Sequence, residues 1–180
     1  SRDWSSDVCS SDLTWYDPSG ERFGNIRSGD GAWDLNGMDV ITLQSHDHQL
    51  WIGTTEGILF RYDQEREALD EFRITDPRSG WRIDQIYCDL YNQAWLLTEE
   101  FGITRLDPEQ GKFHYYSLFP SKNRHLIDDE RIKIYEDSKS EFWLGGQNIG
   151  VQKYMREEDR FIAYLNNPND PRSLPSSVVE

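Results

Sequence analysis

The sequence predicts an all-β protein built from repeats, and three observations support this fold class. First, residues 50–63, LWIGTTEGILFRYD, are strand formers in which LWIG is followed by the turn TTEG, ending in Gly57, and then by ILFRYD. This is the pattern of a two-strand hairpin. Second, the same pattern returns twice later in the chain. Third, no segment shows the 3.6-residue hydrophobic period of an amphipathic helix over a useful length.

A tryptophan and a following turn glycine mark each recurrence. The pairs are Trp51 and Gly57, Trp95 and Gly102, and Trp143 and Gly150, with the tryptophans 44 and 48 residues apart. Each pair is followed by a large apolar residue (Tyr62, Leu106, Tyr154) and, seven positions later, by another (Leu69, Phe113, Phe161). The segment WYDPSGERF repeats only this last part, with Tyr16 and Phe23. All-strand repeats of roughly 40–50 residues are typical of propeller blades.

Each repeat divides into four short strands. An apolar strand precedes the tryptophan, the tryptophan strand and the strand after the glycine follow, and a last strand comes after a turn such as DPEQGK. Blades of four strands stack face to face and bury both faces. We therefore expect the three tryptophans in equivalent second-strand positions of the core, with the three glycines leading into the third strands.

The predicted architecture is an open arc of about three four-stranded blades from a β-propeller, with partial blades on both sides. The blades are assigned to residues 37–83, 84–130 and 131–167. Residues 14–36 are assigned to the end of a preceding blade and its linker, and residues 168–180 to a linker and the start of the next blade. Closed propellers need typically 4–8 blades, so we expect the chain to be a fragment of a longer protein.

Residues 1–13, SRDWSSDVCSSDL, fit no position of the repeat. The segment resembles a translated sequencing adapter, and we expect a non-native or disordered leader that carries no information about function. It contains Cys9, which leaves Cys88 alone in an apolar strand. A lone strand cysteine is usually a small buried hydrophobic residue, so no disulfide is predicted.

The charge of the chain argues against nucleic acid as a partner. The formal net charge is −14 and there is no run of basic residues. Proteins that bind nucleic acid need clustered lysine and arginine to displace counterions from the phosphates. The acidic residues are spread through the turns, which is the pattern of a solvated surface.

Three stretches, LWIGTTEGILFRYD, YEDSKSEFWLGG and RLDPEQGKF, resemble the two-component-regulator propeller repeat. The resemblance covers about residues 14–180, including the linker YLNNPNDPRSLPSSVV. The chain departs from the usual pattern in two places. Leu96 and Leu97 stand where Ile-Gly is expected, and Met155 and Arg156 stand where Asp-Pro is expected.

The resemblance implies the periplasmic sensor region of a bacterial membrane-bound hybrid two-component regulator. Such propellers contact a breakdown product of a complex carbohydrate and signal to a histidine kinase, or in related sensors to another output domain. The expected partners are an oligosaccharide, further blades and a downstream signalling domain of the same chain, and a second subunit in a homodimer of the full-length form. No catalytic residue, cofactor or metal is expected in this segment.

Two other functional classes remain open. Some propeller lyases use a metal with His and Glu residues on one face, but the four histidines here (His46, His48, His114 and His125) do not recur at one repeat position. The motif His46-Asp47-His48 falls in a hairpin position that is polar in every repeat. We interpret it as a turn, because isolated metal motifs often match by chance. The third class is a structural propeller that mediates protein assembly.

Two tryptophans, Trp33 and Trp81, lie outside the repeat register. Both fall in connections between blades, which share a face with the turns inside the glycine motifs, and binding residues often lie on loops held by a rigid scaffold. The residues predicted to form a ligand-facing rim are Trp33, Trp81, Arg82, Arg124, His125 and Asn148. The alternative interpretation is that both tryptophans fill the gap between blades.

Overall fold

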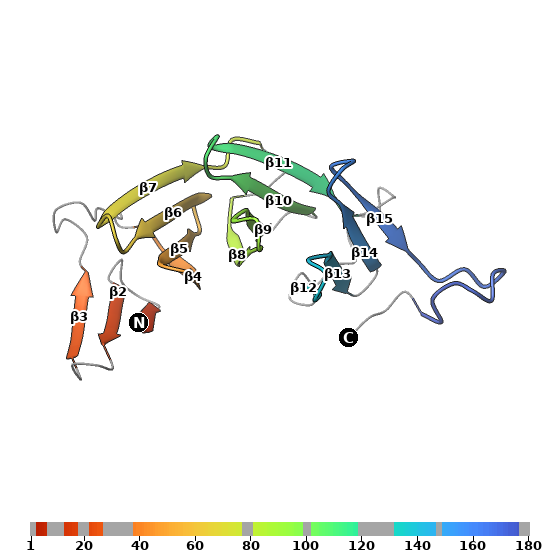
Figure 1. The fold of residues 1–180 in the computed structure, drawn as a ribbon, viewed down its shortest axis with the longest axis horizontal. Coiled ribbons are helices and arrows are strands. Elements are labelled where there is room, and N and C mark those ends of the chain that lie inside the picture. Colours follow the sequence, from red (N-terminus) through yellow and green to blue (C-terminus); the bar gives the residue numbers. More distant parts are fainter. Residues whose placement is uncertain are drawn as a thin grey trace.

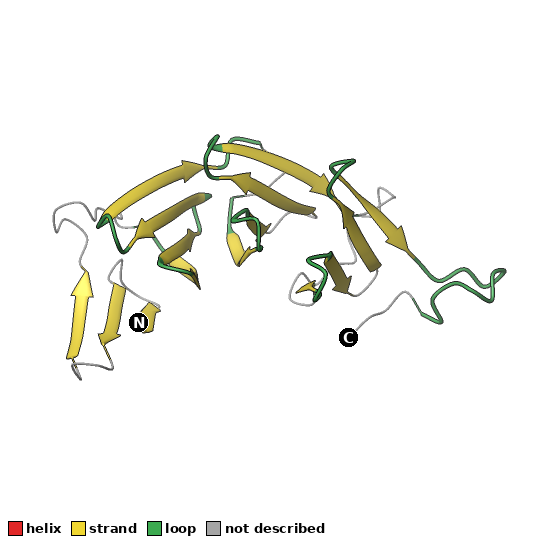
Figure 2. Ribbon diagram, in the orientation of Figure 1, coloured by secondary structure: helices red, strands yellow, loops and turns green. Residues whose placement is uncertain are grey.

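The computed structural model of residues 1–180 describes the backbone of residues 3–6, 13–17, 22–26, 38–76, 81–98, 102–118, 132–146 and 149–176, and the side chains of these ranges from residue 38 onward. The described residues form strands and turns, with no helix (Figure 2). Within them, no helix is therefore long and apolar enough to cross a membrane.

The strands form four antiparallel sheets, each made of strands consecutive in the chain. The first sheet contains β1 (Asp3–Ser6), β2 (Leu13–Asp17) and β3 (Arg22–Ile26). The second contains β4 (Val40–His46), β5 (Gln49–Thr54), β6 (Ile58–Asp63) and β7 (Ala68–Arg73). The third contains β8 (Ile83–Cys88), β9 (Ala94–Thr98), β10 (Gly102–Asp107) and β11 (Lys112–Ser117). The fourth contains β12 (Lys133–Glu136), β13 (Phe142–Gly146), β14 (Gly150–Met155) and β15 (Arg160–Tyr164).

The four sheets follow one another along an open arc (Figure 1). The first strands β4, β8 and β12 lie towards the concave side, and the last strands β7, β11 and β15 lie along the convex side. Three sheets are complete four-stranded blades. This arrangement confirms the predicted all-β fold and the open propeller arc.

The three repeats share one register. Trp51 pairs with Arg61, Trp95 with Arg105 and Trp143 with Lys153, each time between the second and third strands of a sheet. Gly57 directly precedes β6, while Gly102 and Gly150 are the first residues of β10 and β14. The equal spacing in the sequence thus corresponds to equal positions in the blades.

The core lies between adjacent sheets. Trp51 is buried in a cluster with Ile83, Ile86 and Leu96 of the next sheet. Trp95 is buried in the same way, and its ring stacks on that of Phe142 with the centroids 4.4 Å apart. Trp143 is only partly buried, because no described sheet follows the fourth one to cover its ring.

The leader contributes a strand, although its serine content favours disorder. Asp3–Ser6 pairs with Leu13–Asp17, and Trp4 lies opposite Trp15. Trp15 directly precedes Tyr16, as Arg61 precedes Tyr62, so Trp4 takes the register position of a repeat tryptophan. The physical reason is that β2 has a second edge whose backbone donors and acceptors can be satisfied by any short extended segment.

The first departure from the repeat pattern, Leu96-Leu97 in place of Ile-Gly, changes the packing between blades. A Cβ atom on Gly53 would lie 2.9 Å from Cγ2 of Ile83, so the missing side chain lets β8 approach β5 closely. Leu97 occupies the equivalent position of the third sheet and is buried in the cluster that faces the fourth sheet. The larger side chain therefore fills this interface, and the register is unchanged.

Candidate ligand-facing rim

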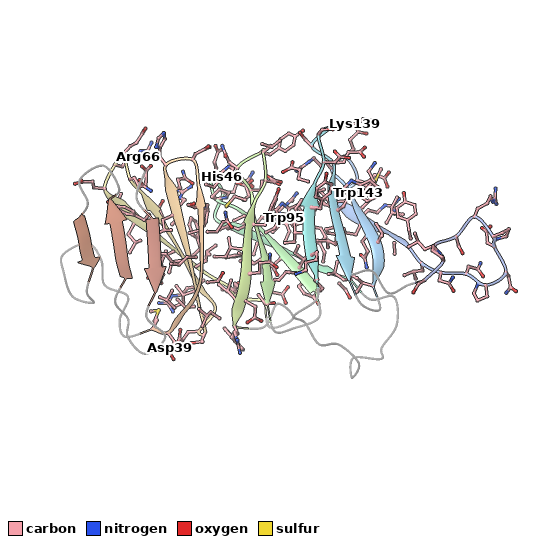
Figure 3. All side chains as sticks on the ribbon, turned by 90° about the horizontal axis from the view of Figure 1, so that it is seen from below. Asp39, His46, Arg66, Trp95, Lys139 and Trp143 are labelled. Carbon is pink, nitrogen blue, oxygen red and sulfur yellow. The ribbon has the colours of Figure 1, made fainter. Side chains whose placement is uncertain are left out.

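The strand ends lie on two opposite rims of the arc (Figure 3). His46, Arg66 and Lys139 lie on one rim, and Asp39 lies on the other. We call the first the hairpin rim, made by the turns at residues 47–48, 64–67, 89–93, 108–111, 137–141 and 156–159. We call the second the connection rim, and its described part contains Asp39 and residues 55–57, 74–76 and 81–82.

The connection rim is held together around the turn between β5 and β6. The N–H of Thr55 donates to the carbonyl of Asp39 at 3.0 Å, and the N–H of Ile74 donates to the carbonyl of Gly57 at 3.0 Å. Gly57 has a φ of 73°, a left-handed conformation that favours glycine. The turn is therefore bonded both to the segment before β4 and to the segment after β7.

Trp81 lies against this turn, and Arg82 follows it. A Cβ atom on Gly57 would be 3.0 Å from the carbonyl oxygen of Trp81 and 3.2 Å from Cε3 of its ring. The Trp81 side chain is nevertheless 53% exposed. Arg82 is also exposed, and its Nε lies 2.7 Å from Oδ1 of Asp84. Trp81 therefore packs partly against the turn and is partly exposed, and the guanidinium of the next residue, Arg82, is paired with Asp84.

Two of the six predicted rim residues, Trp81 and Arg82, which are neighbours in the sequence, lie in the described part of the connection rim. The other four, Trp33, Arg124, His125 and Asn148, lie outside the described residues. The described part of the rim therefore provides an aromatic surface, a charged pair and backbone groups, the kind of mixture that small-molecule sites use for orientation.

The His46-Asp47-His48 motif lies on the hairpin rim. Asp47 has a φ of 52°, as expected for a tight turn. Nε2 of His46 is 3.3 Å from Oδ1 of Asn92 in the next sheet, whereas His48 lies 3.9 Å from Glu65 of its own sheet. The two imidazoles have separate partners, and the described side chains contain no group of three His, Cys, Asp or Glu residues that could hold a metal ion.

The structure also contains a buried ionic group that the sequence analysis did not identify. Asp89 is fully buried, and its Oδ1 accepts hydrogen bonds from the N–H groups of Tyr91 and Gln93 at 2.9 and 3.0 Å. Its Oδ2 accepts from the indole N–H of Trp95 at 2.9 Å and from Nη2 of Arg156 at 3.0 Å. The aspartate thus joins the third sheet to the fourth.

Arg156 is the second departure from the repeat pattern. It stands where Pro108 stands in the third sheet, on the turn between the last two strands. Its guanidinium lies 4.0 Å from the ring centre of Tyr91 and 3.6 Å from Oε1 of Glu136. Replacement of proline by arginine therefore adds a charge contact between blades, and the missing Asp-Pro is the sequence signal that marks it.

A second cluster joins the same two sheets nearer the convex side. Oδ1 of Asp159 accepts hydrogen bonds from the hydroxyls of Tyr116 and Tyr154 at 2.5 and 2.6 Å. Nη2 of Arg105 lies 3.2 Å from the same oxygen, and Nδ1 of His114 lies 3.6 Å from Oδ2. Burial alone would raise the pKa of Asp159, but the two hydroxyls and Arg105 together lower it.

Neither cluster has the properties of a nucleophilic centre. Burial, with the charge of Asp89, raises the pKa of the Cys88 thiol to about 12, so that it stays protonated near neutral pH. Burial and then Glu136 raise the pKa of Tyr87 to about 12. Burial and then Arg105 lower the pKa of His114. Tyr87 and His114 contact carboxylates of the fourth sheet, Glu136 and Asp159, and Cys88 is buried, so the described contacts of these groups are structural.

Comparisons with known proteins identify the fold. No family model matches the chain, and no curated protein matches its sequence. Among solved structures, the chain is similar to virginiamycin B lyase from Staphylococcus aureus, with a TM-score of 0.64, 15% identity and coverage of 94% of this chain and 53% of the lyase. It is also similar to the extracellular domain of a protein assigned as a hybrid two-component system from B. thetaiotaomicron, with a TM-score of 0.61, 16% identity and coverage of 97% and 21%.

A third similar structure is the extracellular domain of a protein assigned as a one-component system from B. thetaiotaomicron, with a TM-score of 0.60 and 15% identity over 98% of this chain and 22% of that one. The chain thus spans about half the length of the lyase and about a fifth of the two sensor domains. At these identities the likeness concerns the fold. The chain is an open arc of β-propeller blades, a fold shared by extracellular sensor domains and by a lyase.

Proposed function

We propose that the chain forms part of the ligand-sensing propeller of a bacterial membrane-bound two-component regulator. In this proposal the propeller lies in the periplasm, binds a carbohydrate breakdown product at its connection rim and signals to a histidine kinase of the same protein. The full-length form acts as a homodimer, and this segment performs no catalysis itself.

The proposal is carried by one combined observation: the chain has the repeat signature, and it also has a rim residue, Trp81, that lies outside the repeat register. LWIGTTEGILFRYD and its two relatives occupy equivalent strands, while Trp81 is not needed for that register and remains half exposed. An aromatic ring offers an apolar platform to the face of a sugar, and polar neighbours such as Arg82 can bond its hydroxyls. The likeness to two extracellular sensor domains supports the same class.

The first test is the complete gene that contains this chain. A membrane span followed by a kinase or another output domain would support the sensor. A secretion signal with a stop codon soon after the last blade would contradict it and would favour a secreted enzyme.

The second test is ligand binding by the full-length propeller. Digests of plant and host glycans are screened by thermal shift, and a sugar that binds is titrated by calorimetry against Trp81→Ala, Arg82→Ala and the control Arg66→Ala on the hairpin rim. We expect Trp81→Ala to weaken binding by roughly tenfold or more, about 1.4 kcal/mol, at unchanged thermal stability. Loss of stability with unchanged affinity would show that Trp81 only fills the gap between blades.

A lyase is the second candidate, because the chain covers 53% of virginiamycin B lyase with a TM-score of 0.64. One similar structure is an inactive variant of that lyase with quinupristin. Incubation of the full-length protein with quinupristin, followed by mass spectrometry, tests this candidate. Cleavage would favour the lyase, and intact quinupristin alongside a positive control with the lyase itself would exclude this substrate.

A further inference from the structure

Two large apolar residues are exposed on the hairpin rim, in the turn between β8 and β9. Leu90 is 67% exposed and Tyr91 is 59% exposed. The same two positions are polar in the neighbouring sheets: His46 and Asp47 in the second, Ser138 and Lys139 in the fourth. The blade repeat therefore does not require an apolar pair in this turn.

The exposure of this pair does not depend on where the arc ends. The turn belongs to the third sheet, which lies between the second and the fourth (Figure 1). Both neighbouring sheets contact it: Nε2 of His46 lies 3.3 Å from Oδ1 of Asn92, and the N–H of Leu90 donates to Oε2 of Glu136 at 3.3 Å. Further sheets at either end of the arc would therefore leave Leu90 and Tyr91 uncovered.

Hydrogen bonds and a ring contact fix the conformation of the turn. Oδ1 of Asp89 accepts from the N–H groups of Tyr91 and Gln93, and Asn92 has a φ of 57°, a left-handed conformation that asparagine tolerates. The guanidinium of Arg156, itself paired with Asp89, lies 4.0 Å from the ring centre of Tyr91. Because the exposed side chains are held in place before binding, a partner loses less free energy in ordering them.

Acidic residues surround the apolar pair. The described turns of the hairpin rim contain ten aspartates and glutamates but three lysines and arginines. One of these three, Arg156, is already paired with the buried Asp89. Asp47, which follows His46, has a side chain that is 73% exposed, and Glu157, which follows Arg156, is also exposed. The surface therefore combines two apolar side chains with an excess of negative charge.

We propose that Leu90 and Tyr91 form the centre of a protein-interaction surface whose partner is a basic amphipathic segment. Apolar side chains of the partner cover this pair, and its lysines and arginines face the surrounding carboxylates. Tyrosine is enriched at the centre of protein interfaces, and complementary charge around it favours the correct partner. The same carboxylates repel nucleic acid and anionic membranes.

This interaction does not depend on the sensor function proposed above. Leu90 and Tyr91 lie on the hairpin rim, whereas Trp81 lies on the connection rim at the opposite side of the arc. A protein partner on one rim and a ligand on the other can therefore be bound at the same time.

Fluorescence anisotropy with two labelled synthetic peptides tests the proposal on the 180-residue chain. One is an amphipathic peptide of leucine and lysine, and the other has glutamate in place of every lysine. We expect the lysine peptide to bind and the glutamate peptide not to bind. Binding should weaken as salt increases, because salt screens the attraction between exposed charges over about 10 Å at 0.1 M.

Substitutions of the apolar pair test its position at the centre of the surface. Leu90→Ser, which introduces the residue of the fourth sheet, and Tyr91→Ala should each raise the dissociation constant of the lysine peptide by roughly tenfold. Tyr164→Ala is the matched control, because Tyr164 is 45% exposed and is the last residue of β15, at the end away from the hairpin rim. It should leave the dissociation constant unchanged. Circular dichroism checks that each variant folds.

A second pair of variants tests the charge. Glu157→Gln should raise the dissociation constant by about threefold and reduce its salt dependence, whereas Glu56→Gln, also exposed but on the connection rim, should change neither. Absence of binding by the lysine peptide would overturn the proposal, as would equal binding of both peptides or equal effects of Tyr91→Ala and Tyr164→Ala. A neutral oligosaccharide that binds independently of salt and is lost in Tyr91→Ala would also overturn it, in favour of a sugar site.

Discussion

At the scale of single residues, the third and fourth sheets share an aspartate six positions before the repeat tryptophan. Asp89 and Asp137 hold this position, and each accepts hydrogen bonds from two backbone N–H groups and from an indole N–H. The same side chain therefore shapes the hairpin and orients the tryptophan. Ser45 stands at this position in the second sheet, so the device is not used in every blade.

Asp89→Ala should strongly destabilise the fold. The substitution leaves the buried indole N–H without its acceptor and Arg156 without its closest carboxylate, a loss of about 3 kcal/mol for a broken buried pair. Urea unfolding followed by circular dichroism measures it. Asp137→Ala is the control: its indole hydrogen bond is longer, at 3.4 Å, and Trp143 is only partly buried. A loss at Asp137 equal to that at Asp89 would contradict the role given to Arg156.

Asp159 gives a prediction about pH. The tyrosine hydroxyls and Arg105 hold its pKa below the ordinary value of 3.8 against the opposing effect of burial. Because the pKa of Asp159 is lower in the folded than in the unfolded protein, its carboxylate stabilises the fold fully above about pH 4. This contribution is lost as the pH falls through the pKa of the folded protein. Asp159→Asn should therefore be less stable than the parent by a constant amount above about pH 4.

Urea unfolding of the parent and of Asp159→Asn from about pH 7 to about pH 2.5 tests this expectation. The difference in unfolding free energy should shrink as the pH falls below about 4, because the carboxyl group of Asp159 takes up a proton in the unfolded chain before it does so in the folded parent. Asparagine tolerates the left-handed φ of 50° found at Asp159, so the backbone of the turn should be retained. A difference that does not change with pH would show that the charge of Asp159 contributes nothing.

At the scale of strands and turns, the repeat spacing predicts most of the fold. The tryptophan and glycine spacing correctly places the second and third strands of three sheets, because strand alternation and turn glycines are local properties of the sequence. The strand Asp3–Ser6 was not predicted, because its pairing depends on the free edge of β2 and not on its own composition. The contact of Arg156 with Asp89 spans two repeats, so no local pattern contains it.

The candidate site is less predictable than the fold. The position of Trp81 outside the register correctly indicated a connection between sheets, but its contact with Gly57 follows only from the structure. A ligand-binding role for Trp81 and Arg82 stays a prediction. The same holds for Trp33, Arg124, His125 and Asn148, which lie outside the described residues. Long connections carry no periodic pattern, and so the sequence alone does not define their conformation.

Gly57→Ala should cost more stability than Gly111→Ala. Both glycines have a positive φ, 73° and 63°, so both substitutions carry a conformational cost of about 1–2 kcal/mol. A Cβ atom on Gly57 would also lie 3.0 Å from the carbonyl oxygen of Trp81, whereas a Cβ atom on Gly111 would have no atom within 4 Å. Thermal unfolding of the two variants measures the difference, and equal losses would contradict the packing of the connection rim.

At the scale of the whole molecule, stability comes from interfaces between neighbouring sheets. Trp51 and Trp95 are both covered by the following sheet, and the two charged clusters join the third sheet to the fourth. In such repeat architectures each unit depends on its neighbours. The arc is therefore held together by a series of equivalent contacts, and the partly buried Trp143 marks the place where that series stops within the described residues.

A crystal structure of the chain, with its repeats superposed, tests the propeller arc most directly. The account predicts that Trp51, Trp95 and Trp143 superpose on the second strand of three four-stranded sheets, each opposite a cation on the third strand: Arg61, Arg105 and Lys153. Tryptophans on different strands, or on opposite faces of their sheets, would contradict it.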